Sequence, residues 1–164
     1  MATTNPVRVF CYPALAAALM AMVLATPGLS FAAGGDDDDS APQSEYSLAK
    51  QALKDGDYEA AVDKLARLHE NDPEDADVLN LLGYGYRKIG NIDQARGYYL
   101  QALAIEPKHR GANEYLGELY LETGRLDKAE ERLAVLDKDC WLGCDEYTDL
   151  KESVEKYKTG KGLQ

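Results

Sequence analysis

The hydrophobic residues of this chain recur with the spacing of an α-helix. In the segment VLNLLGYGYRKIG, apolar or aromatic residues stand at Leu79, Leu82, Tyr86 and Ile89, three or four positions apart. Residues with this spacing lie on one face of a helix, whereas a half-buried strand would alternate strictly. The pattern therefore predicts an amphipathic helix whose apolar face is buried.

A related pattern returns at a fixed interval. The segments DGDYEAA (55–61), IGNIDQA (89–95) and TGRLDKA (123–129) carry a glycine, an apolar residue and an alanine at matching positions. The residues that recur every 34 positions are Gly56, Gly90 and Gly124, Ala61, Ala95 and Ala129, and Pro73 and Pro107. A strict period of this length is typical of proteins built from stacked repeats.

The glycines fall into two groups with different predicted roles. Gly56, Gly90 and Gly124 are predicted to end the first helix of each repeat, where a left-handed residue costs little only if it is glycine. Gly83 and Gly117 fall inside predicted helices, where glycine costs up to about 1 kcal/mol relative to alanine. We therefore expect these two to permit close contact between the two helices of a repeat.

The repeats resemble the tetratricopeptide repeat (TPR) family, in which each unit is a pair of antiparallel helices. Residues 76–109 match all eight signature positions of that family, and 42–75 and 110–143 match most of them. The matching residues are Leu48, Ala49, Ala52, Ala61, Leu65, Leu68 and Pro73, then Leu79, Leu82, Gly83, Tyr86, Ala95, Tyr99, Ala102 and Pro107, then Leu116, Gly117, Tyr120, Ala129, Leu133 and Leu136. The departures are Glu45, Asn113 and Trp141.

This resemblance implies an all-α fold over residues 45–158. The expected architecture is a right-handed α-solenoid of three TPR helix pairs plus a capping helix, seven helices in all. Stacked repeats bury their apolar faces against each other, so the last one needs a cover with a polar outer face.

The segment 144–158 fits the requirement for a capping helix. Tyr147, Leu150, Val154 and Tyr157 form one apolar stripe along it at helical spacing. We expect this helix to pack on the third repeat, and residues 159–164 to fray.

The first 32 residues have the pattern of a secretory signal peptide. Arg8 precedes an apolar run (14–25), and Ser30 and Ala32 stand at the −3 and −1 positions of a cleavage site. The run is shorter than the roughly 20 residues that span a bilayer. We therefore predict cleavage after Ala32 and export to the periplasm. The alternative is an uncleaved membrane anchor.

The linker and the net charge of the chain bear on which classes of partner it can bind. Residues 33–44, a linker rich in glycine and aspartate, cannot bury apolar area and are predicted to be disordered. The whole chain has a net charge of −11. Because phosphate groups are bound mainly by lysine and arginine, this excess of acid disfavours nucleic acid and anionic lipid as partners. Contact with a membrane is expected only through an uncleaved signal segment.

No set of residues in the sequence indicates catalysis. His69 and His109 lie in no metal-binding or nucleophile-activating motif, and we interpret both as partly exposed surface residues. We predict that the protein is not an enzyme. It is expected to have no metal, no cofactor and no small-molecule substrate.

The TPR resemblance implies a concave binding wall made mainly by the first helix of each repeat. Its candidate binding residues are Tyr46, Lys50, Asn80, Tyr84, Arg87, Glu114 and Glu118, with Leu53, Leu121, Thr148 and Glu152 beside them. The first half of this wall is aromatic and basic, and the second half is acidic. We predict that a peptide or partner segment binds here, oriented by that polarity, with Tyr84 as an amphipathic anchor. The alternative is that these charges form only a solvated face.

One known activity of the family is not expected. Some TPR proteins bind the C-terminal carboxylates of chaperones through a two-carboxylate clamp. The clamp positions correspond here to Tyr46, Lys50, Leu81, Gly111 and Tyr115. Only Lys50 could bind a carboxylate, so the clamp is incomplete.

Cys140 and Cys144 flank Trp141 where the third repeat meets the capping helix. Export permits a disulfide, which would pin the capping helix to the repeat and contribute roughly 2 kcal/mol in the chain-entropy model. Trp141 is expected to cover the apolar edge of the solenoid. Reactive thiols and a metal site are the alternatives, since two thiolates can bind Cu(I).

Two classes of function follow from the sequence. The first is a non-enzymatic protein–protein interaction scaffold of the bacterial cell envelope, whose partner the sequence does not name. The second is a periplasmic thiol- or copper-handling protein that uses Cys140 and Cys144.

Overall fold

The computed structural model describes residues 44–160, which contain all three predicted repeats apart from residues 42 and 43. The predicted signal peptide (1–32), the linker up to residue 43 and the end of the tail (161–164) lie outside the described residues. The predictions for those segments therefore stay predictions.

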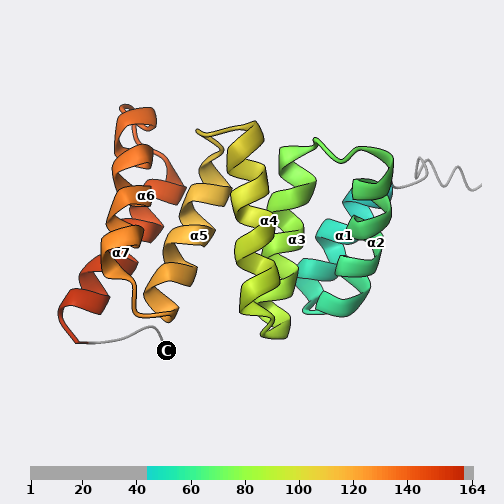
Figure 1. The fold of residues 1–164 in the computed structure, drawn as a ribbon, viewed down its shortest axis with the longest axis horizontal. Helices are drawn as coiled ribbons and strands as arrows, with labels where there is room; N and C mark the ends of the chain where they lie inside the picture. Colours follow the sequence, from blue (N-terminus) through green and yellow to red (C-terminus); the bar gives the residue numbers. More distant parts are fainter. Residues whose placement is uncertain (1–43, 161–164) are drawn as a thin grey trace, which may run out of the picture. The chain divides into compact units, whose positions relative to one another are not determined.

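Seven α-helices and no strand make up the described part of the chain (Figure 1). Their bounds are α1 (Glu45–Asp55), α2 (Tyr58–Asn71), α3 (Ala76–Ile89), α4 (Ile92–Ile105), α5 (Arg110–Glu122), α6 (Leu126–Asp139) and α7 (Asp145–Lys158). Figure 1 shows the helix pairs in a row, from α1 and α2 at one end, through α3 and α4 and then α5, to α6 and α7 at the other. The prediction of an all-α solenoid with seven helices is confirmed. Within residues 44–160, no helix combines the length and apolarity needed to cross a bilayer.

The helices begin and end at residues whose chemistry suits those positions. Side-chain oxygens of Ser44, Asp57, Asp75 and Asn91 accept hydrogen bonds from backbone N–H groups in the first turns of α1 to α4. Such caps satisfy N–H groups that have no partner within the helix. At the ends of α1 and α3, Gly56 and Gly90 adopt φ of 81° and 92°, and Gly124 after α5 has φ of 74°. The prediction that a glycine in the left-handed conformation ends each of these three helices is confirmed.

Gly83 allows the two helices of the second repeat to approach closely. A Cβ atom at this position would lie 2.5 Å from the ring of Tyr99 in α4. At Gly117 a Cβ would lie 2.6 Å from Leu150, which belongs to α7 rather than to α6. The predicted contact is thus confirmed for Gly83, but the predicted partner of Gly117 was wrong. The third repeat has Leu133 where the second has Tyr99, and the close neighbour of Gly117 is instead a side chain of the capping helix.

The core consists of two clusters of buried residues, and the partly buried Tyr86 and Tyr98 pack against both. One cluster joins α1, α2 and α3, and a larger one joins α3 to α7. In α7, Leu150 and Val154 are buried, and Tyr147 and Tyr157 pack beside them on the larger cluster. The predicted apolar stripe of the capping helix is therefore confirmed. The helix starts at Asp145, one residue later than predicted, because Cys144 takes the N-cap position.

The turn between α6 and α7 carries the cysteine pair. Cys140 and Cys144 are joined by a disulfide with their Cα atoms 5.5 Å apart, inside the range that disulfides require. The tip of this turn, Trp141 and Leu142, is 80% exposed at both residues. The expectation that Trp141 covers the apolar edge of the solenoid was wrong. Helix α7 already covers that edge through Leu150 and Val154, and the Trp141 side chain stays exposed.

The close approach at Gly83 can be tested against a second helical glycine. We expect Gly83→Ala to destabilise the protein, because overpacking costs about 1–3 kcal/mol and the better helix propensity of alanine returns at most about 1 kcal/mol. Gly97→Ala in α4 is the matched control, since a Cβ there has no heavy atom within 4 Å and the change should stabilise. Urea unfolding measures both. If the two variants were equally stable, a Cβ at position 83 would not clash with Tyr99, and the close approach of α3 and α4 would not depend on glycine.

Candidate binding site on the inner wall

We call the surface formed by α1, α3, α5 and α7 the inner wall. All seven predicted binding residues belong to helices of this surface, but their environments differ. Two of them line a pocket, Lys50 and Tyr84. Arg87 and Glu118 bind each other, and Asn80 and Glu114 are buried. Tyr46 is half-buried on α1, with the ammonium of Lys50 5.5 Å from its ring centroid.

A pocket of about 230 Å³ opens where the first helices of the three repeats meet. Its lining residues are Lys50, Leu53 and Lys54 of α1, Leu81 and Tyr84 of α3, and Tyr115 of α5. The ring centroids of Tyr84 and Tyr115 lie 5.1 Å apart, so the two rings form one aromatic surface. The pocket thus requires all three repeats, because each contributes part of its lining and none contains it alone.

The pocket combines aromatic groups with ammonium groups. Burial, and then the nearby charge of Glu114, raise the pKa of Tyr115 to about 12, so its phenol stays neutral. The Lys88 ammonium lies 5.2 Å from the ring centroid of Tyr84, and Lys50 and Lys54 are exposed. An apolar or aromatic side chain would fit this surface, with an electronegative neighbour facing the lysines.

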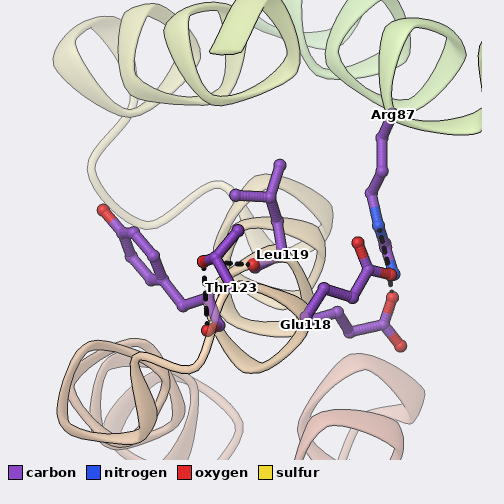
Figure 2. A network of polar contacts seen from close by, with 6 residues as sticks. Arg87, Glu118, Leu119 and Thr123 are labelled. Carbon is purple, nitrogen blue, oxygen red and sulfur yellow. Dashed lines mark hydrogen bonds and ion pairs between the residues drawn. The ribbon is translucent and has the colours of Figure 1, made fainter. Parts of the chain in front are cut away.

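Arg87 links the second and third repeats (Figure 2). Its Nη1 donates to Oε2 of Glu118 at 2.6 Å, and its Nε and Nη2 donate to Oε1 of Glu122 at 3.0 and 2.5 Å. The Arg87 side chain is only 9% exposed. Burial disfavours its charge, but the hydrogen bonds with the two carboxylates outweigh that effect and raise its pKa. Arg87 and Glu118 are therefore engaged with each other rather than open to a ligand.

Glu114 is a buried acid on the same helix as Glu118. It is 9% exposed and makes no hydrogen bond or ion pair within residues 44–160. Burial, followed by the charges of Glu118, Asp149 and Glu146, raises its pKa to about 8 against the opposing charge of Arg87. Its carboxyl group is accordingly protonated in most molecules at pH 7.

Asn80 is a second buried polar residue of the inner wall. It is 6% exposed, and its Oδ1 has no hydrogen-bond partner in the described part of the chain. Its Nδ2 lies against α5 at Gly111, where a Cβ would be only 2.9 Å away. The absence of a side chain at Gly111 is what lets the Asn80 amide reach α5.

The interpretation of His109 as a surface residue was wrong. It is 8% exposed and serves as the N-cap of α5. Its Nδ1 accepts from the Ala112 N–H at 3.2 Å, while Nε2 lies 3.1 Å from Asp77 Oδ1 and donates to it. A histidine in place of the usual Ser, Asp or Asn hides this cap from sequence rules. His69 is half-buried, as predicted. Within residues 44–160, no three His, Cys, Asp or Glu residues are grouped so as to hold a metal ion.

Sequence reasoning missed three residues of the pocket, Lys54, Leu81 and Tyr115. A signal for two of them was present. Leu81 and Tyr115 occupy positions that correspond to the two-carboxylate clamp of the resembling family, which marked them as facing the wall. Their apolar and aromatic character excluded the clamp activity but not a different ligand.

The repeat pattern is matched independently by family comparison. Tetratricopeptide repeat models match residues 46–84 and 90–139. The chain belongs to the tetratricopeptide repeat family. Comparison with curated proteins gives no match.

Solved TPR structures share the fold. The Yersinia enterocolitica type III secretion chaperone SycD, in complex with a peptide of the translocator YopD, is 26% identical, with a TM-score of 0.61 over 71% of this chain and 92% of that one. PcrH in complex with the chaperone-binding region of PopD is 19% identical, with a TM-score of 0.63 over 71% and 90%. The first TPR of Spaghetti (RPAP3), bound to the HSP90 peptide SRMEEVD, is 16% identical, with a TM-score of 0.61 over 71% and 90%.

The raised pKa of Glu114 should make stability fall as pH rises. The unfolded chain loses this proton near pH 4.5, whereas the folded chain keeps it up to about pH 8. Between these values the folded state binds more protons, so each increase in pH favours unfolding. Glu114→Gln has no proton to lose. We therefore expect the stability of this variant relative to wild type to improve by on the order of 2 kcal/mol between pH 5 and pH 8. One pKa unit corresponds to about 1.4 kcal/mol. Water at the wall screens part of the electrostatic effect, so the expected change is smaller than the full pKa shift would give.

Urea unfolding at the two pH values measures this difference. Glu155→Gln is the matched control, because Glu155 is an exposed residue of α7 and its replacement makes the same change in net charge. A stability difference between Glu114→Gln and wild type that stays constant from pH 5 to pH 8 would contradict the raised pKa.

Proposed function

We propose that this TPR protein is a non-enzymatic protein–protein interaction scaffold of the bacterial cell envelope. It binds a peptide or partner segment along the inner wall. The observation that carries this proposal is the pocket between α1, α3 and α5, whose two tyrosines and two leucines are reached from solvent beside exposed lysines. A site of this kind suits an apolar anchor side chain of a protein partner.

The structural neighbours support the same class of function. SycD and PcrH are described in complexes with a peptide of YopD and the chaperone-binding region of PopD, and the RPAP3 domain with an HSP90 peptide. In these complexes the shared fold is bound to a peptide or a region of another protein. The pocket here differs from a carboxylate clamp, because Leu81, Gly111 and Tyr115 stand at clamp positions.

The size of the pocket limits what it can hold. A volume of about 230 Å³ is below the roughly 300–1,000 Å³ typical of sites for small molecules. It suits one side chain of a longer segment, whose remaining residues would lie along α3 and α5. The exposed ammonium groups of Lys50 and Lys54 favour an acidic residue or a free carbonyl next to that anchor.

Tyr84→Ala tests the proposal because it removes half of the aromatic surface of the pocket. Tyr98→Ala is the control: Tyr98 stacks on Tyr86 from α4 and does not line the pocket. With the exported protein as bait in its own envelope extract, we expect a partner, identified by mass spectrometry, to be recovered with wild type and Tyr98→Ala. Recovery should fall at least tenfold with Tyr84→Ala. If circular dichroism shows that both variants are folded and both recover the partner equally, the pocket is not the binding site.

The cysteine pair has a structural role in this proposal. The two sulfur atoms are bonded to each other in the structure, and Cys140 is buried beside the core. We propose that the exported protein keeps this disulfide, which clasps α7 to the third repeat. The alternative of a thiol- or copper-handling protein would need both thiolates, and no feature of residues 44–160 favours it over the clasp.

Alkylation of the periplasmic fraction tests both export and oxidation. After cleavage behind Ala32, Cys11 is removed, and the mature chain begins at Ala33 with two cysteines. We expect a maleimide reagent to modify neither cysteine before reduction and both after it, on a protein whose intact mass starts at Ala33. Labelling without reductant would favour the thiol-handling alternative. An unprocessed mass would favour the membrane anchor.

A further inference from the structure

The turn between α6 and α7 exposes two large apolar side chains to solvent. Trp141 and Leu142 are each 80% exposed, whereas the other exposed large hydrophobic residues within 44–160 are at most 46% exposed. Single exposed apolar side chains are common on protein surfaces, but two adjacent ones at this exposure form a patch that water disfavours. We call Trp141 and Leu142 the apolar tip. Its exposure indicates a surface that is buried in a complex.

The backbone holds the apolar tip in one conformation. The Gly143 N–H donates to the Cys140 carbonyl at 2.7 Å, which closes a turn over residues 140–143 with the apolar tip at its two central positions. The disulfide between Cys140 and Cys144 closes the same turn a second time. A side chain on a fixed turn loses little conformational freedom on binding, so the apolar tip is preorganised to enter a pocket.

The pocket between α1, α3 and α5 has the matching composition. Tyr84 and Tyr115 give it an aromatic surface, and its volume of about 230 Å³ suits one large side chain. Tryptophan is among the residues that most often anchor a protein interface by filling such a pocket. No residue of the apolar tip lines this pocket, and both tip residues are exposed, so the tip of the same chain does not fill it.

The charges beside these two surfaces are largely of opposite sign. Lys50 and Lys54 line the pocket and are exposed. Asp137 and Asp145, on either side of the apolar tip, are also exposed, and Lys138 is the opposing charge at this turn. Two copies repel each other through their net charge of −11. At physiological salt the Debye length is about 8 Å, so the charges at the contact outweigh the distant ones.

We propose that the apolar tip of one copy docks into the pocket of a second copy of this chain. The inference rests on the proposed function, because it names the occupant of the same pocket when no partner segment is bound. Trp141 fills the space beside Tyr84 and Tyr115, and the acids next to the tip face the lysines of the pocket. The contact regulates the scaffold, since a partner segment has to displace the tip of the neighbouring copy before its own anchor can enter.

The contact is small and joins two different surfaces. One tryptophan buries about 150–250 Å², and stable interfaces bury at least roughly 1,200 Å², so the association is weak and reversible on dilution. Each copy also keeps one unused surface, either its tip or its pocket. Copies can therefore join into a chain or close into a ring.

Trp141 is the only tryptophan of the chain, so tryptophan fluorescence reports on the apolar tip alone. The sensor is the exported, disulfide-bonded protein with Tyr84→Ala, which keeps the tip but loses half of the aromatic surface of its pocket. The acceptor is Trp141→Ala, which keeps the pocket and contains no tryptophan. We expect the emission of the sensor to move to shorter wavelength, and to saturate, as acceptor is added, because the indole leaves water for an apolar site.

Further acceptors locate the contact. Trp141→Ala combined with Tyr84→Ala should give no shift, whereas Trp141→Ala combined with Tyr98→Ala should act like the simple acceptor, since Tyr98 does not line the pocket. Trp141→Ala combined with Lys50→Glu and Lys54→Glu should bind the sensor about tenfold more weakly, because the acids beside the tip then meet like charges. Circular dichroism checks that every variant is folded.

Three outcomes overturn the proposal. The first is no shift with the folded Trp141→Ala acceptor. The second is an equal shift with the acceptor that also lacks Tyr84, because the tip would then dock elsewhere. The third is a shift with phosphatidylcholine vesicles but not with the acceptor, which would assign the tip to a lipid surface.

Failure of this self-docking and failure of the proposed function give different results. If Tyr84→Ala lowers partner recovery from the envelope extract but the acceptor does not shift the sensor, the scaffold stands and self-docking does not occur. If the acceptor shifts the sensor but Tyr84→Ala recovers the partner as well as wild type does, the pocket holds only a second copy and the proposed function fails.

Discussion

The close approach of neighbouring helices at small residues is the constraint on which the rest of the structure depends. Each helix pair can bury its apolar face only against the next pair. Gly83 and Gly117 bring α3 against α4 and α5 against α7 to distances at which a single added Cβ would collide with Tyr99 or Leu150. This packing brings the first helices of the three repeats into one surface, and the pocket exists only because they meet there.

The same close packing decides which charged side chains of the wall pair with each other. Arg87 spans the junction between the second and third repeats and binds Glu118 and Glu122. In doing so it stabilises the junction, but it leaves Glu114 buried without a counter-charge. The inner wall therefore has an aromatic pocket with lysines at its rim and a buried acid, Glu114, without a paired cation.

The fold was predictable from the sequence because the information for it is local and repeated. Gly56 and Gly90 end helices by backbone conformation, which depends on the residue itself rather than on distant neighbours. The 34-residue period and the apolar stripe of α7 likewise need no long-range knowledge. The same reasoning placed the candidate residues on α1, α3 and α5, and two of them, Lys50 and Tyr84, line the pocket.

The sequence by itself therefore determined the repeats, the helices and the face of the wall, since helical spacing places every side chain around its own axis. Only the tertiary structure decided what each side chain meets across helices. It paired Arg87 with acids more than thirty residues away, buried His109 as a cap, left Trp141 exposed and isolated Glu114. These outcomes depend on burial and on distances between helices, and residue spacing along one chain contains neither.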